Sequence, residues 1–333
     1  MARPTMRDVA TAADVSIKTV SRVVNGEPGV SAVTAARVGA AIAHLGFARN
    51  DVAHSLRSGR AGALGLIIED VANPFYSAIA RAVEDAASER GHILITGSCE
   101  EDPTRERRLA VRLLRRLVDA LLIVPAGPDH RYLLPELSID TPIVFLDRPS
   151  RGVAADTVLL DNLGGARAGV EHLLGQGHER IAFIGDSSEL YTAGERLAGY
   201  RAALADAGRE ARGELIRAGS HDAAHAAHSA QMLLALPPGR RPTAMLCANN
   251  RNTIGALRAL RNAPSPIALV GFDDFELADM LATPVTVVRH SPEEMGRIAA
   301  ELAYRRLGGY AGAPEHRTIP CELVIRGSGE VAP

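Results

Sequence analysis

Side chains that can bind a polyhydroxylated small molecule follow several predicted strands of this 333-residue chain. Carboxylates accept hydroxyl protons, arginines and amides donate hydrogen bonds in return, and aromatic rings pack on the C–H surface of a sugar. Ligands of α/β folds bind at the carboxyl ends of strands, so we expect these side chains to converge. They are Asn73, Phe75, Tyr76, Asp147, Arg148, Arg196 (at a predicted helix start), Asn249, Asp273 and His290.

No arrangement for catalysis accompanies these acids. Nothing beside them is placed as a nucleophile or general base, and the phosphate-loop, dinucleotide, nucleophile-elbow and H-E-x-x-H patterns are missing. His221, His225 and His228 share one face of a predicted helix at a spacing that can hold a metal. No carboxylate or cysteine completes that set, so we favour a solvated face, with His221 as a candidate for the cleft. We therefore expect no enzyme, no metal and no cofactor.

From residue 62 onward, apolar runs alternate with amphipathic helical patterns. Such alternation predicts an α/β fold with parallel sheets covered by helices on both faces. The number of units over about 270 residues favours two lobes rather than one sheet. The predicted strands are 63–68, 92–97, 120–124, 143–146, 157–160, 181–185, 244–248, 268–271 and 285–288.

The first sixty residues predict a small basic helical domain. They contain eight Lys/Arg and four Asp/Glu, whereas the whole chain has a net charge of −2. Thr5 with Asp8 forms a capping-box pattern, Ser16 can cap a second helix, and a third follows Ser31. Two short helices joined by a tight turn and closed by a third predict a helix-turn-helix. A generic helical bundle is the alternative; the polar, basic outer face of the second helix favours DNA binding.

Residues 6–50 resemble, nearly residue for residue, the headpiece of the lactose-repressor/galactose-repressor family. The resemblance implies that Ile17, Lys18 and Arg22 reach base edges. It also implies a second set that positions phosphates or lies near bases, namely Thr5, Ser16, Thr19, Ser21 and Asn25. Asp14 departs from the family, which has glycine in this turn.

Residues 50–59 are similar to the hinge helix of that family. A segment this short does not hold a helix alone in water. The resemblance implies that two copies fold together in the minor groove, where Asn50 contributes to DNA binding and Leu56 opens a base step. The alternative is a flexible linker with an exposed Leu56.

The resemblance continues through residues 73–87, 161–185, 196–204, 242–250, 271–281 and 322–329. It implies a headpiece (1–47), a hinge (48–60) and a two-lobed periplasmic-binding-protein-like core whose chain crosses between the lobes three times. The N-lobe takes 61–160 and 290–320, and the C-lobe takes 161–289 and 321–333. The cleft residues are similar to the ribose pattern of this superfamily, except that His290 stands for glutamine and Asn250 for aspartate.

Three functions remain open at this point. The first is a dimeric repressor that binds a pseudo-palindromic DNA operator and responds to a sugar, most closely a ribose-like pentose. The second is a purine- or nucleoside-responsive regulator in which the ligand strengthens DNA binding. The third, a transport binding protein, conflicts with the headpiece and the polar N-terminus. Three distant cysteines and the absence of an eighteen-residue apolar run predict a cytoplasmic protein without a membrane partner.

Overall fold

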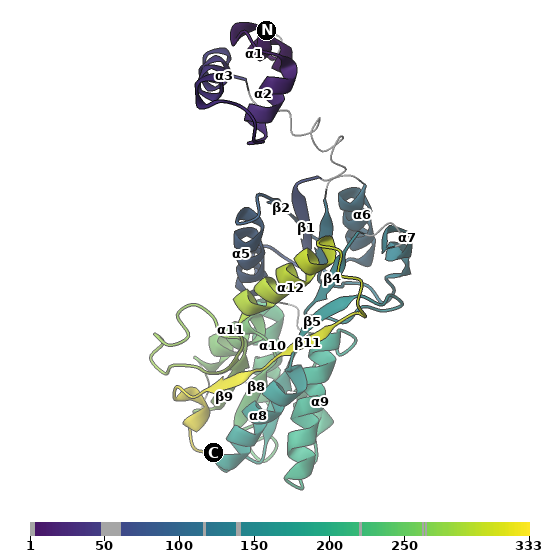
Figure 1. Ribbon diagram of the computed structural model, residues 1–333. Helices are drawn as coiled ribbons and strands as arrows, with labels where there is room; N and C mark the ends of the chain where they lie inside the picture. Colours follow the sequence, from purple (N-terminus) through teal and green to yellow (C-terminus); the bar gives the residue numbers. More distant parts are fainter. Residues whose placement is uncertain are drawn as a thin grey trace. The chain divides into compact units, whose positions relative to one another are not determined.

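The computed structural model describes residues 4–47, 61–115, 118–137, 141–219, 222–261, 263 and 265–333 (Figure 1). The chain divides into two compact units, Met1–Ala61 and Gly62–Pro333, each of which is considered by itself. The predictions made for Asn50, Leu56 and His221 lie outside the described residues.

The first unit contains three helices, α1 (Met6–Ala12), α2 (Ile17–Val24) and α3 (Ala32–Leu45). The predicted capping box is present, because Asp8 N–H donates to Thr5 Oγ1 and Thr5 N–H donates to Asp8 Oδ2 at 2.7 Å. The hydroxyls of Ser16 and Ser31 cap the other two helices. Their apolar faces meet in a small core that includes Val9, Val20 and Val38.

The second unit contains two six-stranded sheets. The first has the order β11-β5-β4-β3-β1-β2, and all its pairs are parallel. Its strands are β1 (Ala63–Ile68), β2 (Ile93–Ser98), β3 (Ala120–Ile123), β4 (Ile143–Leu146), β5 (Asp156–Leu160) and β11 (His316–Ile319). All six belong to the N-lobe as defined above. The runs that form β1, β3 and β4 are buried throughout, as expected of central parallel strands.

The second sheet has the order β12-β10-β9-β8-β6-β7 and belongs to the C-lobe. Its strands are β6 (Ile181–Ile184), β7 (Ile216–Arg217), β8 (Ala244–Cys247), β9 (Ala268–Phe272), β10 (Thr286–Arg289) and β12 (Glu322–Val324). Only the β10–β12 pair among them is antiparallel. The chain passes between the sheets after β5, after β10 and between β11 and β12. The predicted fold class is thereby confirmed.

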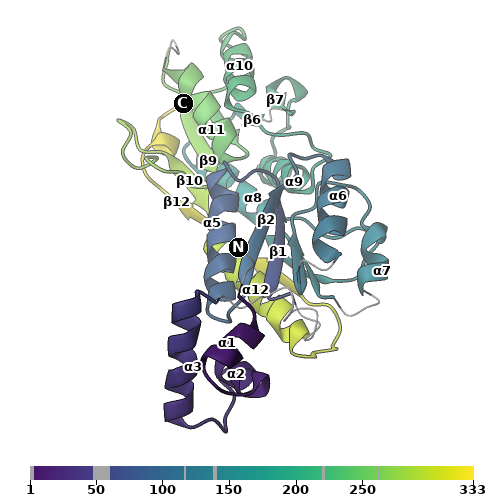
Figure 2. The same ribbon diagram turned by 90° about the horizontal axis from the view of Figure 1, so that it is seen from above.

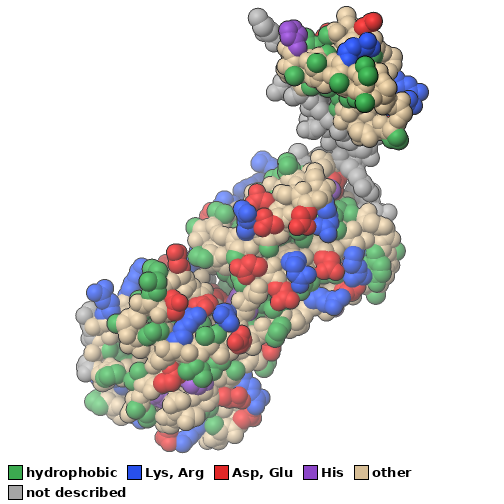
Figure 3. Space-filling view, turned by 60° about the vertical axis from the view of Figure 1, so that its left-hand side comes forward, with side chains coloured by type: hydrophobic (Ala, Val, Ile, Leu, Met, Phe, Trp, Pro, Cys, Tyr) green, Lys and Arg blue, Asp and Glu red, His purple; other side chains and the backbone are tan. Residues whose placement is uncertain are grey.

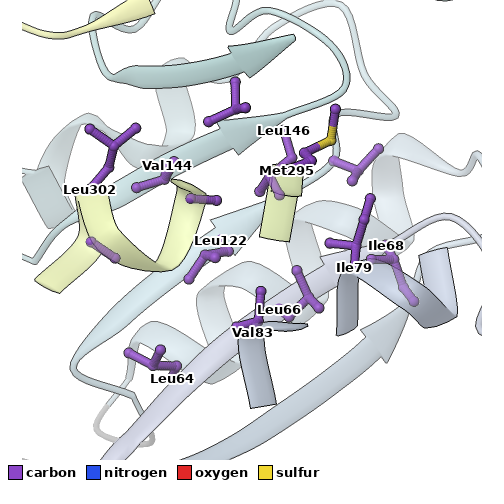
Figure 4. Packing of buried hydrophobic residues seen from close by; sticks show 14 of the residues in the cluster. Leu64, Leu66, Ile68, Ile79, Val83, Leu122, Val144, Leu146, Met295 and Leu302 are labelled. Carbon is purple, nitrogen blue, oxygen red and sulfur yellow. The ribbon is translucent and has the colours of Figure 1, made fainter. Parts of the chain in front are cut away.

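Helices cover both faces of each sheet. In the N-lobe, α5 (Pro74–Ser88) and α12 (Pro292–Leu307) pack on one face, where Leu66, Val83 and Met295 meet (Figure 4). The opposite face carries α6 (Pro103–Leu114) and lies near the short α7 (Leu134–Leu137) (Figure 2). In the C-lobe, α8 (Asn162–Gly175) and α9 (Tyr191–Asp206) cover one face, and α10 (Ala223–Leu234) and α11 (Asn250–Leu260) cover the other. Single 3-10 turns lie at Arg131–Leu133, Gly213–Leu215 and Ser328–Glu330.

The surface of the core mixes charges of both signs on the face shown in Figure 3. Across the described ranges, no helix combines the length and the apolar character needed to cross a membrane.

The close packing of α8 on α9 yields a prediction for stability. A Cβ added to Gly199 would clash with the carbonyl oxygen of Leu163 and lie 3.1 Å from the Cβ of Ala166. We expect Gly199→Ala to lower the free energy of unfolding by about 1–3 kcal/mol, because backbone cannot yield as a side-chain tip can. Thermal unfolding followed by circular dichroism measures this. Gly213→Ala, with open space around the added Cβ, is the control and should leave the melting temperature nearly unchanged.

Candidate functional site

The predicted ligand-binding residues that the structure describes lie at the facing ends of the two lobes. Asn73 ends the turn after β1 and caps α5, whose first turn carries Phe75 and Tyr76. Asp147 and Arg148 directly follow β4. The remaining residues lie after β8, after β9 and within α9 of the C-lobe, and at the crossing after β10 where the N-lobe segment 290–320 begins. They are Asn249, Asp273, Arg196 and His290.

A buried carboxylate organises the C-lobe side of this cleft. Asp273 Oδ1 accepts a hydrogen bond from His290 Nε2 at 2.8 Å and lies 3.5 Å from Arg196 Nη2. Burial acts to raise the pKa of Asp273, but the charge of Arg196 and the hydrogen bond from His290 outweigh it and hold the pKa below its usual value. Asp273 is therefore ionised at neutral pH.

Arg196 is held on several sides. Its Nε donates to Asn162 Oδ1 at 2.7 Å, and its Nη1 donates to the carbonyl oxygen of Ala248 at 2.5 Å. Its guanidinium carbon lies 3.8 Å from the centre of the Phe272 ring, which adds a cation–π contact. The arginine is thus preorganised beside Asp273.

The pKa of the N-lobe carboxylate, Asp147, is shifted in the opposite direction to that of Asp273. Asp147 is buried, and Tyr76 Oη donates to its Oδ2 at 3.4 Å. Burial raises the pKa of Asp147 in spite of the nearby charges of Arg148 and Arg196. The charges of Asp273 and His290 also act on Asp147, which places the two carboxylates in one site.

Three buried polar atoms of this site have no hydrogen-bond partner within the part of the chain that the structure describes. They are Asp147 Oδ1, Arg148 Nε and His290 Nδ1. The other two guanidinium nitrogens of Arg148 bind the carboxylate of Glu101 at 2.5 and 2.7 Å. An unsatisfied buried polar atom costs about 1–3 kcal/mol, so a ligand with matching hydroxyls would be stabilised here.

Phe75 supplies an apolar wall between these polar groups. Its ring centroid lies 4.8 Å from Tyr76 and 5.3 Å from His290, both in edge-on arrangements. An aromatic ring therefore lies next to the imidazole of His290, where the C–H face of a sugar could pack on it.

Two of the predicted side chains already have partners within the protein. Asn249 Oδ1 caps α11 through Asn252 N–H, and its Nδ2 donates to Asp186 Oδ2 at 2.9 Å. Asn73 Oδ1 caps α5 through Phe75 N–H and accepts from Asn250 Nδ2 at 3.2 Å. Both asparagines therefore help to shape the cleft as helix caps, Asn249 with a contact inside the C-lobe and Asn73 with one to the opposite lobe.

Several cleft residues are missed by the sequence reasoning. Tyr191 and Arg148 line a cavity of about 220 Å³ together with residues 125–128 and 189–190. The pKa of Tyr191 is raised by burial, by Glu195 and by the charge of Asp147, which indicates that the ring reaches the cleft. Asp186 follows β6 and could have been found by the same strand-end rule. Glu101, the partner of Arg148, lies three residues after β2 and could also have been found by this rule.

In the first unit, the residues predicted to contact DNA lie on and around α2. Ile17 and Lys18 are exposed at its first turn, and Arg22 is partly exposed one turn later. Ser16 Oγ accepts from Thr19 N–H at 3.1 Å, and Asn25 Nδ2 contacts Ser21 Oγ and Glu27 Oε1. Thr5 Oγ1 is engaged with Asp8 at 2.7 Å.

The turn before α2 accommodates its unusual aspartate. Asp14 adopts a φ of 48°, and Arg37 Nη2 donates to its carbonyl oxygen at 3.2 Å. Aspartate tolerates the left-handed region better than most residues, so the helix-turn-helix geometry persists without glycine.

Known protein families match both units. Residues 5–50 match the bacterial regulatory proteins of the lacI family, and residues 170–329 match the periplasmic binding protein-like domain. The ribose operon repressor of Escherichia coli strain K12 is 33% identical over 315 residues, which cover 91% of this chain and 93% of the repressor.

The chain belongs to the LacI family of bacterial transcriptional regulators.

Two further relatives support membership of the LacI family. The transcriptional repressor PurR of Aliivibrio fischeri strain MJ11 is 28% identical, with 91% of each chain covered. A crystal structure of the lac repressor dimer bound to operator and the anti-inducer ONPF is 28% identical, with a TM-score of 0.88 over 99% of this chain and 100% of that one. This LacI-family member is accordingly a DNA-binding regulator with a ligand-binding core, and not an enzyme.

The two cleft carboxylates of this regulator predict stability changes of opposite sign. Without ligand, Asp147→Asn should raise the free energy of unfolding by about 0.5–2 kcal/mol near neutral pH, because it removes a buried charge whose pKa is raised. Asp273→Asn should lower it by about 1–3 kcal/mol, because it leaves Arg196 without its ionised partner.

Urea unfolding at several pH values measures both effects. A raised folded-state pKa costs stability at high pH, so the gain from Asp147→Asn should shrink as the pH falls toward the ordinary value of 3.8. A lowered pKa stabilises above the ordinary value, so the loss from Asp273→Asn should shrink only below pH 3.8. Changes of the same sign in both variants would contradict this account.

Proposed function

We propose that this LacI-family regulator is a repressor whose operator affinity is controlled by a small sugar, a ribose-like pentose, bound between the two lobes. This proposal rests mainly on buried polar atoms of Asp147, Arg148 and His290 that have no partner within the described ranges and lie beside the ion pair of Asp273 and Arg196. A sugar hydroxyl both donates and accepts, so one ring can serve carboxylate, guanidinium and imidazole together. The likeness to the ribose operon repressor supports this effector class.

The proposed repressor acts as a homodimer on a pseudo-palindromic operator. The lac repressor, to which the chain is similar over its length, is described as a dimer bound to operator. Exposed apolar side chains on the core, Leu277 and Leu281 among them, line a groove formed by α11 and the loop after β9. A second subunit would cover such a surface. The proposed hinge, with Leu56 at its centre, would join each core to its headpiece.

Purine or nucleoside control is the second candidate. The similarity to PurR favours it, and the ring of Phe75 offers an edge for a planar base. In that case the ligand would act as a corepressor. Weakening and strengthening of operator binding by a ligand both require the ligand to bind two states of the core with different affinities. Operator binding measured with and without ligand therefore shows which of the two effects occurs.

Calorimetric titration of the purified protein tests the effector. We expect D-ribose to bind saturably in the micromolar range and Asp273→Ala to abolish this binding, since the variant also releases Arg196 and His290. Asp206→Ala, which removes an exposed carboxylate of α9, is the control and should bind as the wild type does. Binding of hypoxanthine or adenosine in place of ribose would support the second candidate and overturn the sugar proposal.

The DNA-binding proposal is tested at Lys18. An operator selected from random DNA by the purified protein would be used in equilibrium binding at fixed salt. We expect Lys18→Ala to weaken operator binding by about 1–3 kcal/mol and to relax the preference at one base pair, because this exposed side chain lies at the start of α2. Arg81→Ala on the core is the matched control. An unchanged base preference would show that Lys18 contacts phosphate only.

A further inference from the structure

Two consecutive residues in the first turn of α11 contact the opposite lobe. Arg251 Nη2 lies 2.5 Å from Asp70 Oδ2, and Arg251 Nη1 lies 3.4 Å from Glu69 Oε1. Both acids follow β1 of the N-lobe. The preceding Asn250 donates from Nδ2 to Asn73 Oδ1 at 3.2 Å. The C-lobe therefore holds the whole turn between β1 and α5.

This N-lobe turn is itself well fixed. Asp70 Oδ1 accepts from Ala72 N–H at 2.9 Å, Val71 N–H donates to Ser98 Oγ at 3.2 Å, and Ser77 Oγ donates to the carbonyl oxygen of Val71 at 2.6 Å. The hydrogen bond from Ala72 is the main reason that the pKa of Asp70 lies below its usual value, and Arg251 adds to it. Asp70 thus presents a fixed, ionised carboxylate to Arg251.

Partial burial strengthens the ion pair between Arg251 and Asp70. The side chain of Arg251 is 29% exposed and that of Asp70 31%, and the neighbouring Glu69 is only 19% exposed. Partly buried charges are screened less by salt than surface charges are. The pair joins residues 181 positions apart in sequence, on different lobes, so it stabilises one relative position of the lobes rather than either lobe alone.

Glu69 lies among charges from both lobes. Glu101 and Arg148 belong to the N-lobe, and Arg251 and Asp186 belong to the C-lobe. Burial and then the charge of Glu101 raise the pKa of Glu69 to about 7, Asp186 adds to this rise, and the two arginines oppose it. Separation of the lobes would return Glu69 to water. Contact between the lobes is therefore linked to proton uptake.

We propose that Arg251 is a positioning residue that clamps the C-lobe to the N-lobe through Asp70, and that Glu69, beside the same guanidinium, makes this clamp sensitive to pH. The clamp operates in the protein without effector. It goes beyond the proposed function and does not depend on which ligand the cleft binds.

Distances between the lobes test the clamp directly. Spin labels on cysteines replacing the exposed Arg108 of α6 and Arg201 of α9 report the separation by pulsed electron paramagnetic resonance. The background carries Cys321→Ser and keeps the buried Cys99 and Cys247. Each labelled chain is mixed with excess unlabelled protein, so that a dimer contributes one pair of labels. No effector is added.

Arg251→Ala should increase the ratio of long to short distances about fivefold at pH 8, as expected for loss of a partly shielded ion pair. Arg251→Lys, which keeps the charge but not the two-pronged donor, should open the core by a smaller factor. Arg209→Ala removes a pair with Glu179 inside the C-lobe and should change nothing. Circular dichroism verifies that each variant is folded. A wild-type distance distribution in Arg251→Ala would overturn the clamp.

The role of Glu69 is tested by repeating the measurement between pH 8 and pH 6 in Arg251→Lys. With a pKa of about 7 in contact, against an ordinary value of 4.5, the closed arrangement binds the proton more tightly. The ratio of closed to open should therefore rise by up to about tenfold over this interval as the pH falls. Adding Glu69→Gln should remove the dependence. A ratio independent of pH, with Arg251→Ala still open, would overturn the role of Glu69 and uphold that of Arg251.

Discussion

The ionised carboxylate of Asp273 is the constraint on which the C-lobe side of the cleft depends. A charge removed from water must be paired and hydrogen-bonded. Arg196 and His290 do this, and Arg196 is in turn placed by Asn162 at the start of α8 and by the carbonyl oxygen of Ala248 after β8. One carboxylate therefore ties together β8, β9, α8, α9 and the crossing after β10. This wall of the cleft is preorganised before any ligand binds.

Asp147 and Asp273 also share a backbone feature. Both adopt left-handed conformations, with φ values of 64° and 65°, directly after β4 and β9. Such conformations cost a non-glycine residue roughly 1–2 kcal/mol and persist where the surroundings enforce them. In each lobe, a sharp turn at the strand end therefore directs a short acidic side chain toward the opposite lobe. The environments then separate the two acids, since Arg196 and the hydrogen bond from His290 outweigh the burial of Asp273, whereas burial outweighs the charges of Arg148 and Arg196 at Asp147.

The sequence alone was sufficient to predict the positions at the strand ends and the helix-turn-helix. Continuous apolar runs such as 143–146 and 268–271 can be recognised because buried parallel strands need them, and the residue after each run then has a predictable place. The apolar runs did not predict the strands β7, β11 and β12, since β7 has two residues, β12 has three, and the side chains of β11 are mostly exposed. Asn73 and Asn249 show a different limit. A polar residue at a strand-to-helix turn serves equally well as a helix cap or as a ligand contact, so residue type alone does not separate these roles. The contact of Arg251 with Asp70 had no local signal, because its partners are far apart in sequence.

His290 bears on the chemistry of the effector. Because Asp273 is ionised, it accepts the hydrogen on Nε2, and the buried Nδ1 is left without a partner among the described residues. The glutamine of the ribose pattern would offer both a donor and an acceptor at this point. Arg148 Nε requires an acceptor, Asp147 Oδ1 can accept from a ligand donor, and a ring nitrogen such as His290 Nδ1 can take either role. A purine base has donors and acceptors in fixed positions, whereas each hydroxyl of a sugar rotates to take either role. This difference favours a polyhydroxylated effector over a planar base, and it makes the replacement of glutamine by histidine compatible with a sugar, because a hydroxyl can pair with Nδ1 in either role.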